Sequence, residues 1–70
     1  MSLRERVAKN LRQLRQERSL SQEGLALIAK LNRNYVGMIE RKEYSASVDV
    51  LEKLGAALGV DPIEFFRGDP

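Results

Sequence analysis

Five helix-start signals, spread along the sequence, constrain the fold more than any other feature. A serine, asparagine or aspartate before an apolar helical pattern caps the first free N–H groups of a helix, and a glutamate three residues later completes a capping box. Ser2 and Glu5 form such a box, and Asp61 is followed by Pro62 and then by Glu64. The other three signals are Ser21, Asn32 and Ser47. No segment alternates with period two, so the sequence predicts short helices and no sheet.

Apolar residues recur at helical spacing after each signal. Helices are predicted from about Leu3 to Arg18, from Ser21 through about Ala29, from Arg33 to about Arg41, from Ser47 to Gly59, and over a last turn that carries Ile63. The predicted core is Leu3, Val7, Leu11, Leu14, Leu25, Ala26, Ala29, Val36, Ile39, Val50 or Leu51, Leu54, Ala57 and Leu58. The sequence therefore predicts one all-α domain over residues 1–70, a compact five-helix bundle with a helix-turn-helix over about residues 21–41 and C-terminal helices over about residues 48–67.

The absence of both cysteine and histidine narrows the chemistry. Without cysteine the chain has no disulfide or thiolate metal site, and without histidine it lacks the commonest general base and a usual zinc ligand. The carboxylates are scattered, and no nucleophile has a base beside it, so we expect no enzyme activity, catalytic residue, metal or cofactor. No apolar run approaches the roughly 18 residues of a membrane span. We therefore expect a cytoplasmic protein with no membrane partner and no small-molecule ligand.

The net charge of +2 hides an asymmetry along the sequence. Residues 1–42 hold ten basic and four acidic side chains, whereas residues 43–70 hold two basic and six acidic ones. A basic half fits a polyanionic partner, and it equally fits exposed helix faces that are merely solvated. The charge pattern alone leaves both interpretations open.

The stretch from Leu31 to Tyr44, LNRNYVGMIERKEY, carries the most informative helix face. At about 100° per residue, Val36 and Ile39 point to the core, whereas the opposite arc is exposed. That arc holds Arg33, Asn34, Gly37, Met38 and Arg41, with Tyr35 at its apolar border. Arginine pairs with guanine, asparagine with adenine, and an apolar side chain touches the thymine methyl group, so the face suits a DNA major groove, with the glycine as a low point. The alternative is a solvated face with an incidental glycine.

The segment from Ser21 to Val60, SQEGLALIAKLNRNYVGMIERKEYSASVDVLEKLGAALGV, resembles the helix-turn-helix of the Cro and phage-repressor family, also called the XRE family. LRQLRQERSL is similar to the helix that precedes this motif, and NRNYVGMIER is similar to the recognition helices of controller proteins from restriction-modification systems. The resemblance implies a lambda-repressor-like DNA-binding domain. The sequence departs from the family at Lys30 and Lys42, where glycine is common, and at Gly24, where glutamate is common.

The resemblance also implies roles for individual residues. Arg33, Asn34 and Met38 are expected at base edges, with Tyr35 as a further base or backbone contact. The expected phosphate contacts are Ser21, Gln22, Arg41, Lys42, Ser45 and Ser47, of which Ser21 and Ser47 are also N-cap candidates. In the family, the glutamate that matches Glu40 pairs with an arginine on the first helix, so we expect a structural ion pair between Arg15 and Glu40.

A chain of 70 residues has a small core, and association is a common remedy. Phe65 and Phe66 lie about 100° apart on the last helix, so one can close the core and the other is free for a partner. Related small repressors dimerise through their C-terminal helices, and the expected homodimer contacts are Leu58, Ile63, Phe65 and Phe66. At least one of Leu27 and Ile28 should be exposed, because the inward side of their helix is already occupied.

These observations predict a homodimeric, sequence-specific transcription regulator that inserts its third helix into double-stranded DNA at a pseudo-palindromic operator, with half-sites about 34 Å apart. By resemblance, it would regulate its own expression and control a restriction-modification operon. The alternatives are a prophage or toxin-antitoxin type repressor, or an antitoxin or adaptor module that keeps the fold for protein interactions. The operator sequence and the sign of regulation stay open.

Overall fold

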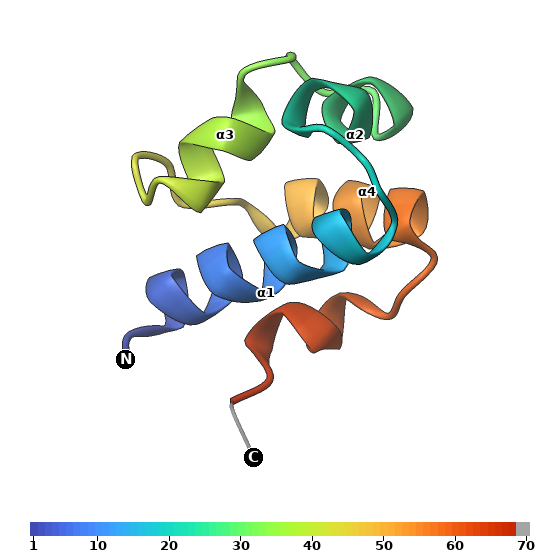
Figure 1. The fold of residues 1–70 in the computed structure, drawn as a ribbon. Coiled ribbons are helices and arrows are strands. Elements are labelled where there is room, and N and C mark those ends of the chain that lie inside the picture. The colour runs from blue at the N-terminus through green and yellow to red at the C-terminus, as the bar shows by residue number, and fades with distance from the viewer. Residues whose placement is uncertain (69–70) are drawn as a thin grey trace.

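Four α-helices and one 3₁₀ helix form the protein in the computed structural model, which describes residues 1–68. The elements are α1 (Leu3–Glu17), α2 (Gln22–Ile28), α3 (Tyr35–Glu40), α4 (Val48–Leu58) and η1 (Pro62–Phe66). Figure 1 shows α1 crossing the molecule, with α2 and α3 above it and η1 below it. The prediction of an all-helical fold is confirmed for the described part of the chain, which contains no strand.

Local capping explains where most of these helices begin. Ser2 and Glu5 form the predicted capping box, in which the Glu5 N–H donates to Ser2 Oγ at 3.1 Å and the Ser2 N–H donates to Glu5 Oε1 at 2.9 Å. Ser21, Ser47 and Asp61 each accept one main-chain N–H, from Gly24, Val50 and Ile63. Four of the five predicted N-caps therefore act as side-chain caps of a helix.

The last of the five predicted helices is a 3₁₀ helix, so the bundle consists of four α-helices and one 3₁₀ helix over the described residues. It spans only five residues and uses i to i+3 bonds, in which the Glu64 N–H donates to the Asp61 carbonyl at 2.9 Å. Its end binds α1 instead of continuing as an α-helix, because Asn10 Nδ2 donates to the carbonyls of Phe65 at 2.9 Å and Arg67 at 2.8 Å. Tertiary hydrogen bonds therefore outweigh local α-helix propensity, which is weak in so short a segment.

The third helix begins at Tyr35, two residues later than predicted. Asn32 closes a turn rather than capping a helix, because its Oδ1 accepts the Asn34 N–H at 3.0 Å and its carbonyl accepts the Tyr35 N–H at 2.9 Å. This Asx turn holds Arg33 and Asn34 outside α3, in the connection from α2. The correction bears on function, since both residues are predicted base contacts.

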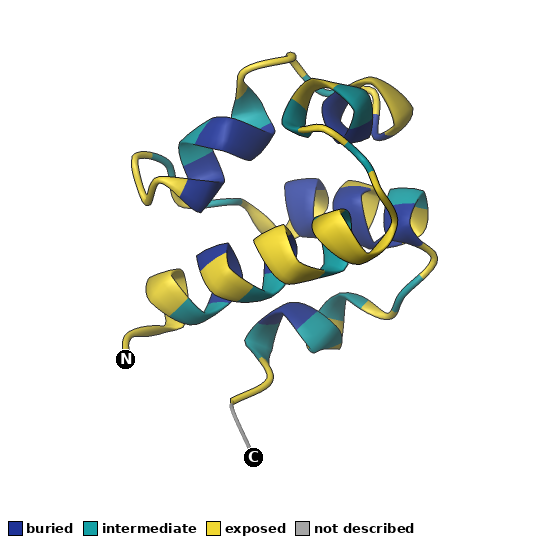
Figure 2. Cartoon of the chain, viewed as in Figure 1, coloured by how far each residue is buried: buried dark blue, intermediate teal, exposed yellow. Residues whose placement is uncertain are grey.

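The buried residues of all five elements meet in one core, and Figure 2 shows them on the inward sides of the helices. The core consists of Val7, Leu11, Leu25, Ala26, Ala29, Val36, Ile39, Val50, Leu51, Leu54, Leu58 and Phe65. Three residues of the predicted core lie outside it. Leu14 and Ala57 are only partly buried, and Leu3, at the first position of α1, is 61% exposed. Within residues 1–68, no helix combines the length and the hydropathy that crossing a membrane requires.

All four α-helices end in the same backbone arrangement, a Schellman motif with a left-handed residue after the helix. The left-handed residues are Ser19 (φ 55°), Lys30 (φ 59°), Lys42 (φ 64°) and Gly59 (φ 71°). After α2, the Lys30 N–H donates to the Leu27 carbonyl at 3.1 Å and the Leu31 N–H donates to the Ala26 carbonyl at 2.9 Å. Glycine adopts this conformation freely, whereas another residue is strained by roughly 1–2 kcal/mol. The two lysines that depart from the family pattern thus keep the backbone expected of glycine.

Replacing Lys30 or Lys42 with glycine should raise the free energy of unfolding by about 1 kcal/mol each, because glycine relieves the left-handed strain. Urea denaturation followed by circular dichroism measures the change. Lys53 is the matched control, since it is an exposed lysine inside α4, where glycine should lower the free energy of unfolding by about 1 kcal/mol. Equal losses of stability in Lys30→Gly and Lys53→Gly would contradict the left-handed assignment.

Candidate nucleic-acid interface

The four predicted base contacts lie together, at the turn before α3 and on α3 itself. Arg33 and Asn34 are exposed in the turn, and the Asn34 side chain makes no capping hydrogen bond. Tyr35 and Met38 are partly buried on α3. The structure therefore brings these residues to one region of the molecule, but on a turn and a helix rather than on a single helix face.

Tyr35 is held by a second aromatic residue that the sequence does not single out. Its ring stacks on the ring of Tyr44, with centroids 5.1 Å apart and planes inclined by 17°. Tyr44 lies after α3 and also packs against the core, so the stack joins the start of α3 to the segment that follows it. Stacked rings stabilise a fold by about 0.5–1.5 kcal/mol. The sequence signal for this pair is that both tyrosines of the chain lie between Leu31 and Tyr44.

Glu40 is the buried charged residue of the described chain, and its side chain is wholly inaccessible to solvent. Arg15 binds it twice, through Nε to Oε2 at 2.7 Å and through Nη2 to Oε1 at 3.0 Å. Arg12 Nε and Gln22 Nε2 also donate to Oε1, at 3.2 and 3.1 Å. The expected ion pair between Arg15 and Glu40 is therefore present, as part of a larger group that joins α1, α2 and α3.

The surroundings of Glu40 keep it ionised. Burial by itself would raise the pKa of its carboxyl, but hydrogen bonds from Arg15, Gln22 and Arg12 outweigh burial and hold that pKa below its usual value near 4.5. The hydrogen bond with Glu40 also raises the pKa of the Arg15 guanidinium. Both groups are therefore charged at neutral pH, and α3 presents no bare negative charge at this position.

Gly37 is buried, contrary to its predicted place as a low point on an exposed face. Two polar side chains lie across it, since a Cβ added at Gly37 would be 2.8 Å from Arg41 Nη1 and 3.0 Å from Gln22 Oε1. A methyl group there would displace at least one of them. The glycine is therefore explained by a close approach of side chains from the same chain.

Five of the six predicted phosphate contacts are exposed residues, and four of these have no hydrogen bond to a carboxylate within residues 1–68, namely Ser21, Lys42, Ser45 and Ser47. The hydroxyl oxygens of Ser21 and Ser47 accept the cap hydrogen bonds of α2 and α4, at 2.8 and 3.1 Å. A hydroxyl group that accepts such a bond still has a proton to donate. Capping and anion binding are therefore compatible at both serines.

The other two predicted phosphate contacts are already engaged by carboxylates. Arg41 Nε donates to Glu43 Oε2 at 3.0 Å, in a pair that is exposed on the surface. Gln22 Nε2 donates to Glu40, so the amide group that a phosphate would need is turned to the interior. The side-chain NH₂ group of Gln22 is thus engaged by Glu40, and the role of Gln22 as a phosphate contact stays a prediction.

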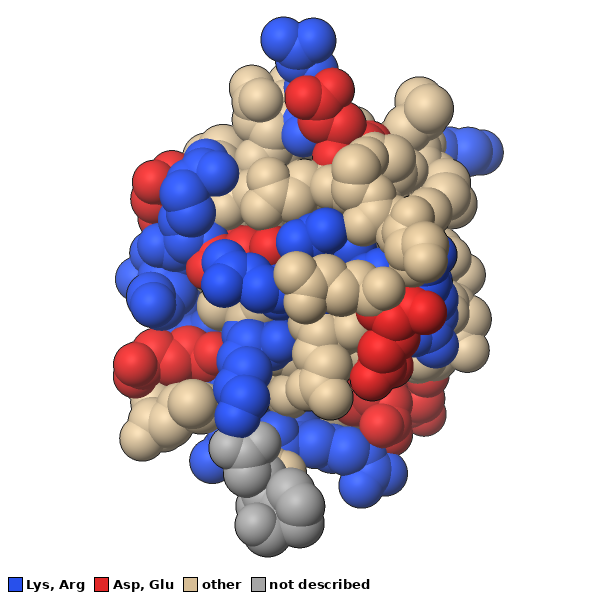
Figure 3. Space-filling model, in the orientation of Figure 1, with Lys and Arg blue, Asp and Glu red and all other residues tan. Residues whose placement is uncertain are grey.

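Several basic side chains of α1, and Arg18 at its C-cap, bind other parts of the chain. Arg18 Nε donates to the Leu58 carbonyl at the end of α4 at 2.7 Å, and Arg6 Nη1 donates to the Phe66 carbonyl at 3.4 Å. Figure 3 shows basic and acidic side chains mixed on the face viewed in Figure 1, which is therefore not uniformly basic. Part of the charge asymmetry along the sequence thus reflects internal contacts rather than a binding surface.

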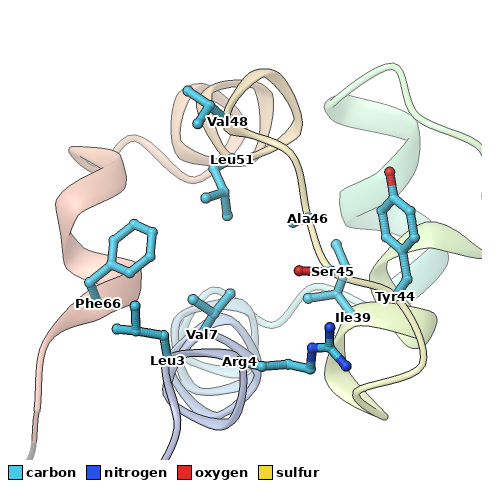
Figure 4. A pocket seen from close by; sticks show the side chains of 10 residues that line it. All are labelled: Leu3, Arg4, Val7, Ile39, Tyr44, Ser45, Ala46, Val48, Leu51 and Phe66. Carbon is cyan, nitrogen blue, oxygen red and sulfur yellow. The ribbon is translucent and has the colours of Figure 1, made fainter.

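Two of the four predicted dimer contacts are part of the core. Leu58 is 4% exposed and Phe65 is 0% exposed, so neither side chain offers surface to a partner, and Phe65 is the phenylalanine that closes the core. Ile63 is 60% exposed on η1, and Phe66 is partly buried. Phe66 borders an apolar groove of about 260 Å³, which Figure 4 shows from close by. The groove lies between α1, α3 with the segment of residues 44–46 that follows it, the start of α4, and η1. The exposed apolar residues that line this groove are Leu3 and Val48.

A further exposed apolar pair lies on α2. Leu27 is 78% exposed and Ile28 is 52% exposed, which confirms that at least one of them is accessible. Leu25 and Ala26 occupy the buried side of the same helix. The exposed pair therefore contributes little to the core.

Known proteins share the sequence pattern and the fold of this chain. A profile of the family described as Helix-turn-helix, HTH_3, matches residues 11–65. The control protein C.SmaI of Serratia marcescens is 43% identical over 58 residues, which cover 83% of this chain and 69% of that protein. The crystal structure of the hypothetical transcription factor NHTF from Neisseria superposes with a TM-score of 0.91 at 38% identity, over 94% of this chain and 76% of that one. The restriction-modification controller protein C.AhdI from Aeromonas hydrophila superposes with a TM-score of 0.86 at 40% identity, over 90% of this chain and 96% of that one.

Proposed function

Because this chain belongs to the helix-turn-helix family HTH_3 of transcription regulators, we propose that it binds a specific operator in double-stranded DNA as a homodimer. The observation that supports the proposal most directly is that the side chains of Arg33 and Asn34 are exposed and unpaired. Both are exposed on the turn that leads into α3, and within residues 1–68 neither side chain is engaged in a hydrogen bond. Exposed side chains with unpaired polar groups suit recognition of base edges in a major groove.

Each residue proposed to contact a base has a matching chemical group on a base edge. Arg33 suits guanine O6 and N7, Asn34 suits adenine N6 and N7, and Met38 suits a thymine methyl group. Tyr35 lies at the border of this surface, and its stacking on Tyr44 fixes the direction in which its hydroxyl can reach a base or a phosphate.

The phosphate contacts flank this reading surface in the sequence. Lys42 and Ser45 follow α3, whereas Ser21 and Ser47 stand at the starts of α2 and α4. Ammonium and hydroxyl groups there can donate to phosphate oxygens on both sides of the groove, which positions the protein without reading sequence. All four residues are exposed, which supports this assignment.

Selection of bound sites from random double-stranded DNA tests the function directly. Arg33→Ala should lower the affinity for the selected site by about 1–3 kcal/mol and relax the preference at one base pair. Lys42→Ala is the matched control. Removal of a phosphate contact should weaken binding to all DNA sequences alike, and the salt dependence of binding should fall by about one released counterion. Equal weakening of all sequences by Arg33→Ala would remove that residue from base reading, and failure of the wild-type protein to enrich any sequence would overturn the function.

The homodimer is proposed to form on the face made by η1 and the apolar groove beside it. Ile63, exposed on η1, and Phe66, at the edge of the groove, supply apolar area that the chain itself leaves open. A two-fold contact would use the same patch on both subunits, as closed dimers do. Asp61 and Glu64, on either side of Ile63 and Pro62, also disfavour a phosphate on the face made by η1.

Sedimentation of Ile63→Glu tests this interface. The wild-type protein should sediment as a dimer and Ile63→Glu as a monomer with an unchanged circular dichroism spectrum, because a buried unpaired carboxylate opposes association while the exposed side chain is not needed for folding. Leu27→Glu, on the other exposed apolar patch, should stay dimeric. A dimeric Ile63→Glu protein would rule out η1 as the centre of the interface.

The genes under control are proposed from the relatives. C.SmaI and C.AhdI are named as control proteins, the latter of a restriction-modification system, which supports regulation of such an operon and of the regulator's own promoter. Fusion of the protein's own promoter to a reporter measures this regulation. Reporter expression that does not change when the protein is supplied in trans would favour the alternative role, a prophage or antitoxin-type repressor of other genes. The exposed Leu27 and Ile28 would suit that role as a pair that binds another protein.

A further inference from the structure

The hydrogen bond to Glu40 determines whether the NH₂ group or the carbonyl oxygen of the Gln22 amide is free to bind another molecule. A carboxylate that is ionised at neutral pH only accepts hydrogen bonds, so the group of Gln22 that lies 3.1 Å from Glu40 Oε1 is the NH₂. The amide carbonyl then points to the other side, where its oxygen lies 3.0 Å from the position of a Cβ on Gly37. Gln22 thus presents an acceptor, and not a donor, over Gly37.

Arg41 places a donor next to this acceptor. Its Nε and Nη2 bind the Glu43 carboxylate at 3.0 and 3.3 Å, whereas its Nη1 lies 2.8 Å from the same Cβ position on Gly37. Within residues 1–68, neither Arg41 Nη1 nor Gln22 Oε1 is used in a hydrogen bond. Gly37 makes the arrangement possible, because a side chain there would occupy the space of both groups.

The pair lies where DNA would reach it if the proposed function is right. Met38, a proposed base contact, directly follows Gly37 in α3. The Arg41 side chain is 51% exposed, and Gln22 is partly exposed at the first position of α2. The acceptor and the donor therefore border the surface that would enter the major groove.

We propose that Gln22 and Arg41 together read one adenine in the operator. Adenine presents its N6 amino donor beside its N7 acceptor on a single edge, and these match the Gln22 carbonyl and the Arg41 N–H. Guanine presents two acceptors on the same edge, so the Gln22 carbonyl would face O6 with no proton between them. Phosphate oxygens are also acceptors, which excludes them as partners of this carbonyl. The inference rests on the proposed DNA-binding function and assigns to base reading two side chains that the family resemblance places on phosphates.

Modified adenines in the selected operator test the proposal with the wild-type protein. In 2-aminopurine the amino group is moved away from the major-groove edge, and in 7-deazaadenine the N7 acceptor is removed. At one adenine, each replacement should lower the affinity about tenfold. Gln22→Ala should be insensitive to 2-aminopurine at that position, and Arg41→Ala should be insensitive to 7-deazaadenine there, because each variant lacks the partner of the altered group.

Asn34→Ala is the control, since it should keep both sensitivities at this adenine and lose them at another. An operator in which no adenine shows this pattern would overturn the proposal while leaving sequence-specific binding intact. Equal weakening of all sequences by Gln22→Ala, with a lower salt dependence, would return Gln22 to a phosphate. If the wild-type protein enriched no sequence, the proposed function would fall, and this inference with it.

Discussion

Arg15→Ala is expected to lower the free energy of unfolding by about 3–5 kcal/mol at neutral pH. The substitution removes two of the four hydrogen bonds to the wholly buried Glu40 carboxylate, and with them the arginine that is itself only 12% exposed. It also releases the Leu20 carbonyl, which accepts from Arg15 Nη1 at 2.9 Å. A buried carboxylate that has lost its main partner keeps its desolvation penalty. Urea denaturation measures the loss.

Arg12→Ala is the matched control on the same carboxylate. Arg12 donates one bond at 3.2 Å and its side chain is 52% exposed, so its removal should lower the free energy of unfolding by about 1 kcal/mol or less. Equal effects of the two arginine substitutions would mean that Glu40 is solvated and not buried.

The loss caused by Arg15→Ala should depend on pH. The pKa of Glu40 is lowered in the folded wild-type protein, so the stability contributed by its ionised form is present above the unfolded pKa near 4.5 and is lost as the pH falls through the folded pKa. The difference in unfolding free energy between wild type and Arg15→Ala should therefore shrink as the pH falls below about 4.5. The part that comes from the Leu20 carbonyl should stay constant, and a wholly pH-independent difference would contradict this account.

Phe65→Ala is expected to lower the free energy of unfolding by about 3–5 kcal/mol, because it leaves a cavity at a side chain that is 0% exposed. Phe65 is the residue through which η1 enters the core formed by the α-helices. A loss of this size is a large part of the stability of a small domain, so denaturation should be followed in a stabilising salt such as sulfate.

Phe66→Ala separates burial from aromatic character. Phe66 is the neighbouring aromatic residue and is only partly buried, at the edge of the apolar groove, so its replacement should lower the free energy of unfolding by about 1–2 kcal/mol. The same loss in both variants would show that the two rings share the core, and that the assignment of Phe66 to the surface is wrong.

Features set by neighbouring residues were predictable from the sequence. Ser2, Ser21, Ser47 and Asp61 all begin helices because a cap needs only a side chain and a main-chain N–H two or three residues away. The start of α3 was not predictable in this way, because Asn32 can cap a helix or close a turn with the same oxygen. The pattern fixed the presence of the helix but not its first residue.

The candidate site was predictable only in part, because its decisive contacts join distant positions. The family resemblance indicates that Arg15 pairs with Glu40, but Gln22 lies 18 residues and Arg12 lies 28 residues from Glu40 along the chain. No helical periodicity relates residues so far apart. The contact of Gln22 with Glu40 also places the Gln22 side chain, together with that of Arg41, over Gly37. A helical wheel of α3 alone does not include Gln22 and therefore predicted an open surface at Gly37.

Polar side chains of α1 and of its C-cap, Arg18, bind the C-terminal part of the chain. Asn10, Arg6 and Arg18 donate to carbonyls of residues 58–67, across separations of up to 60 residues. During synthesis on a ribosome these hydrogen bonds can form only after the last of their partners has been added to the chain. A chain that ended after α4 would therefore keep the bonds of α1 to Glu40 of α3 but would lack the hydrogen bonds from Arg6 and Asn10 to residues 65–67.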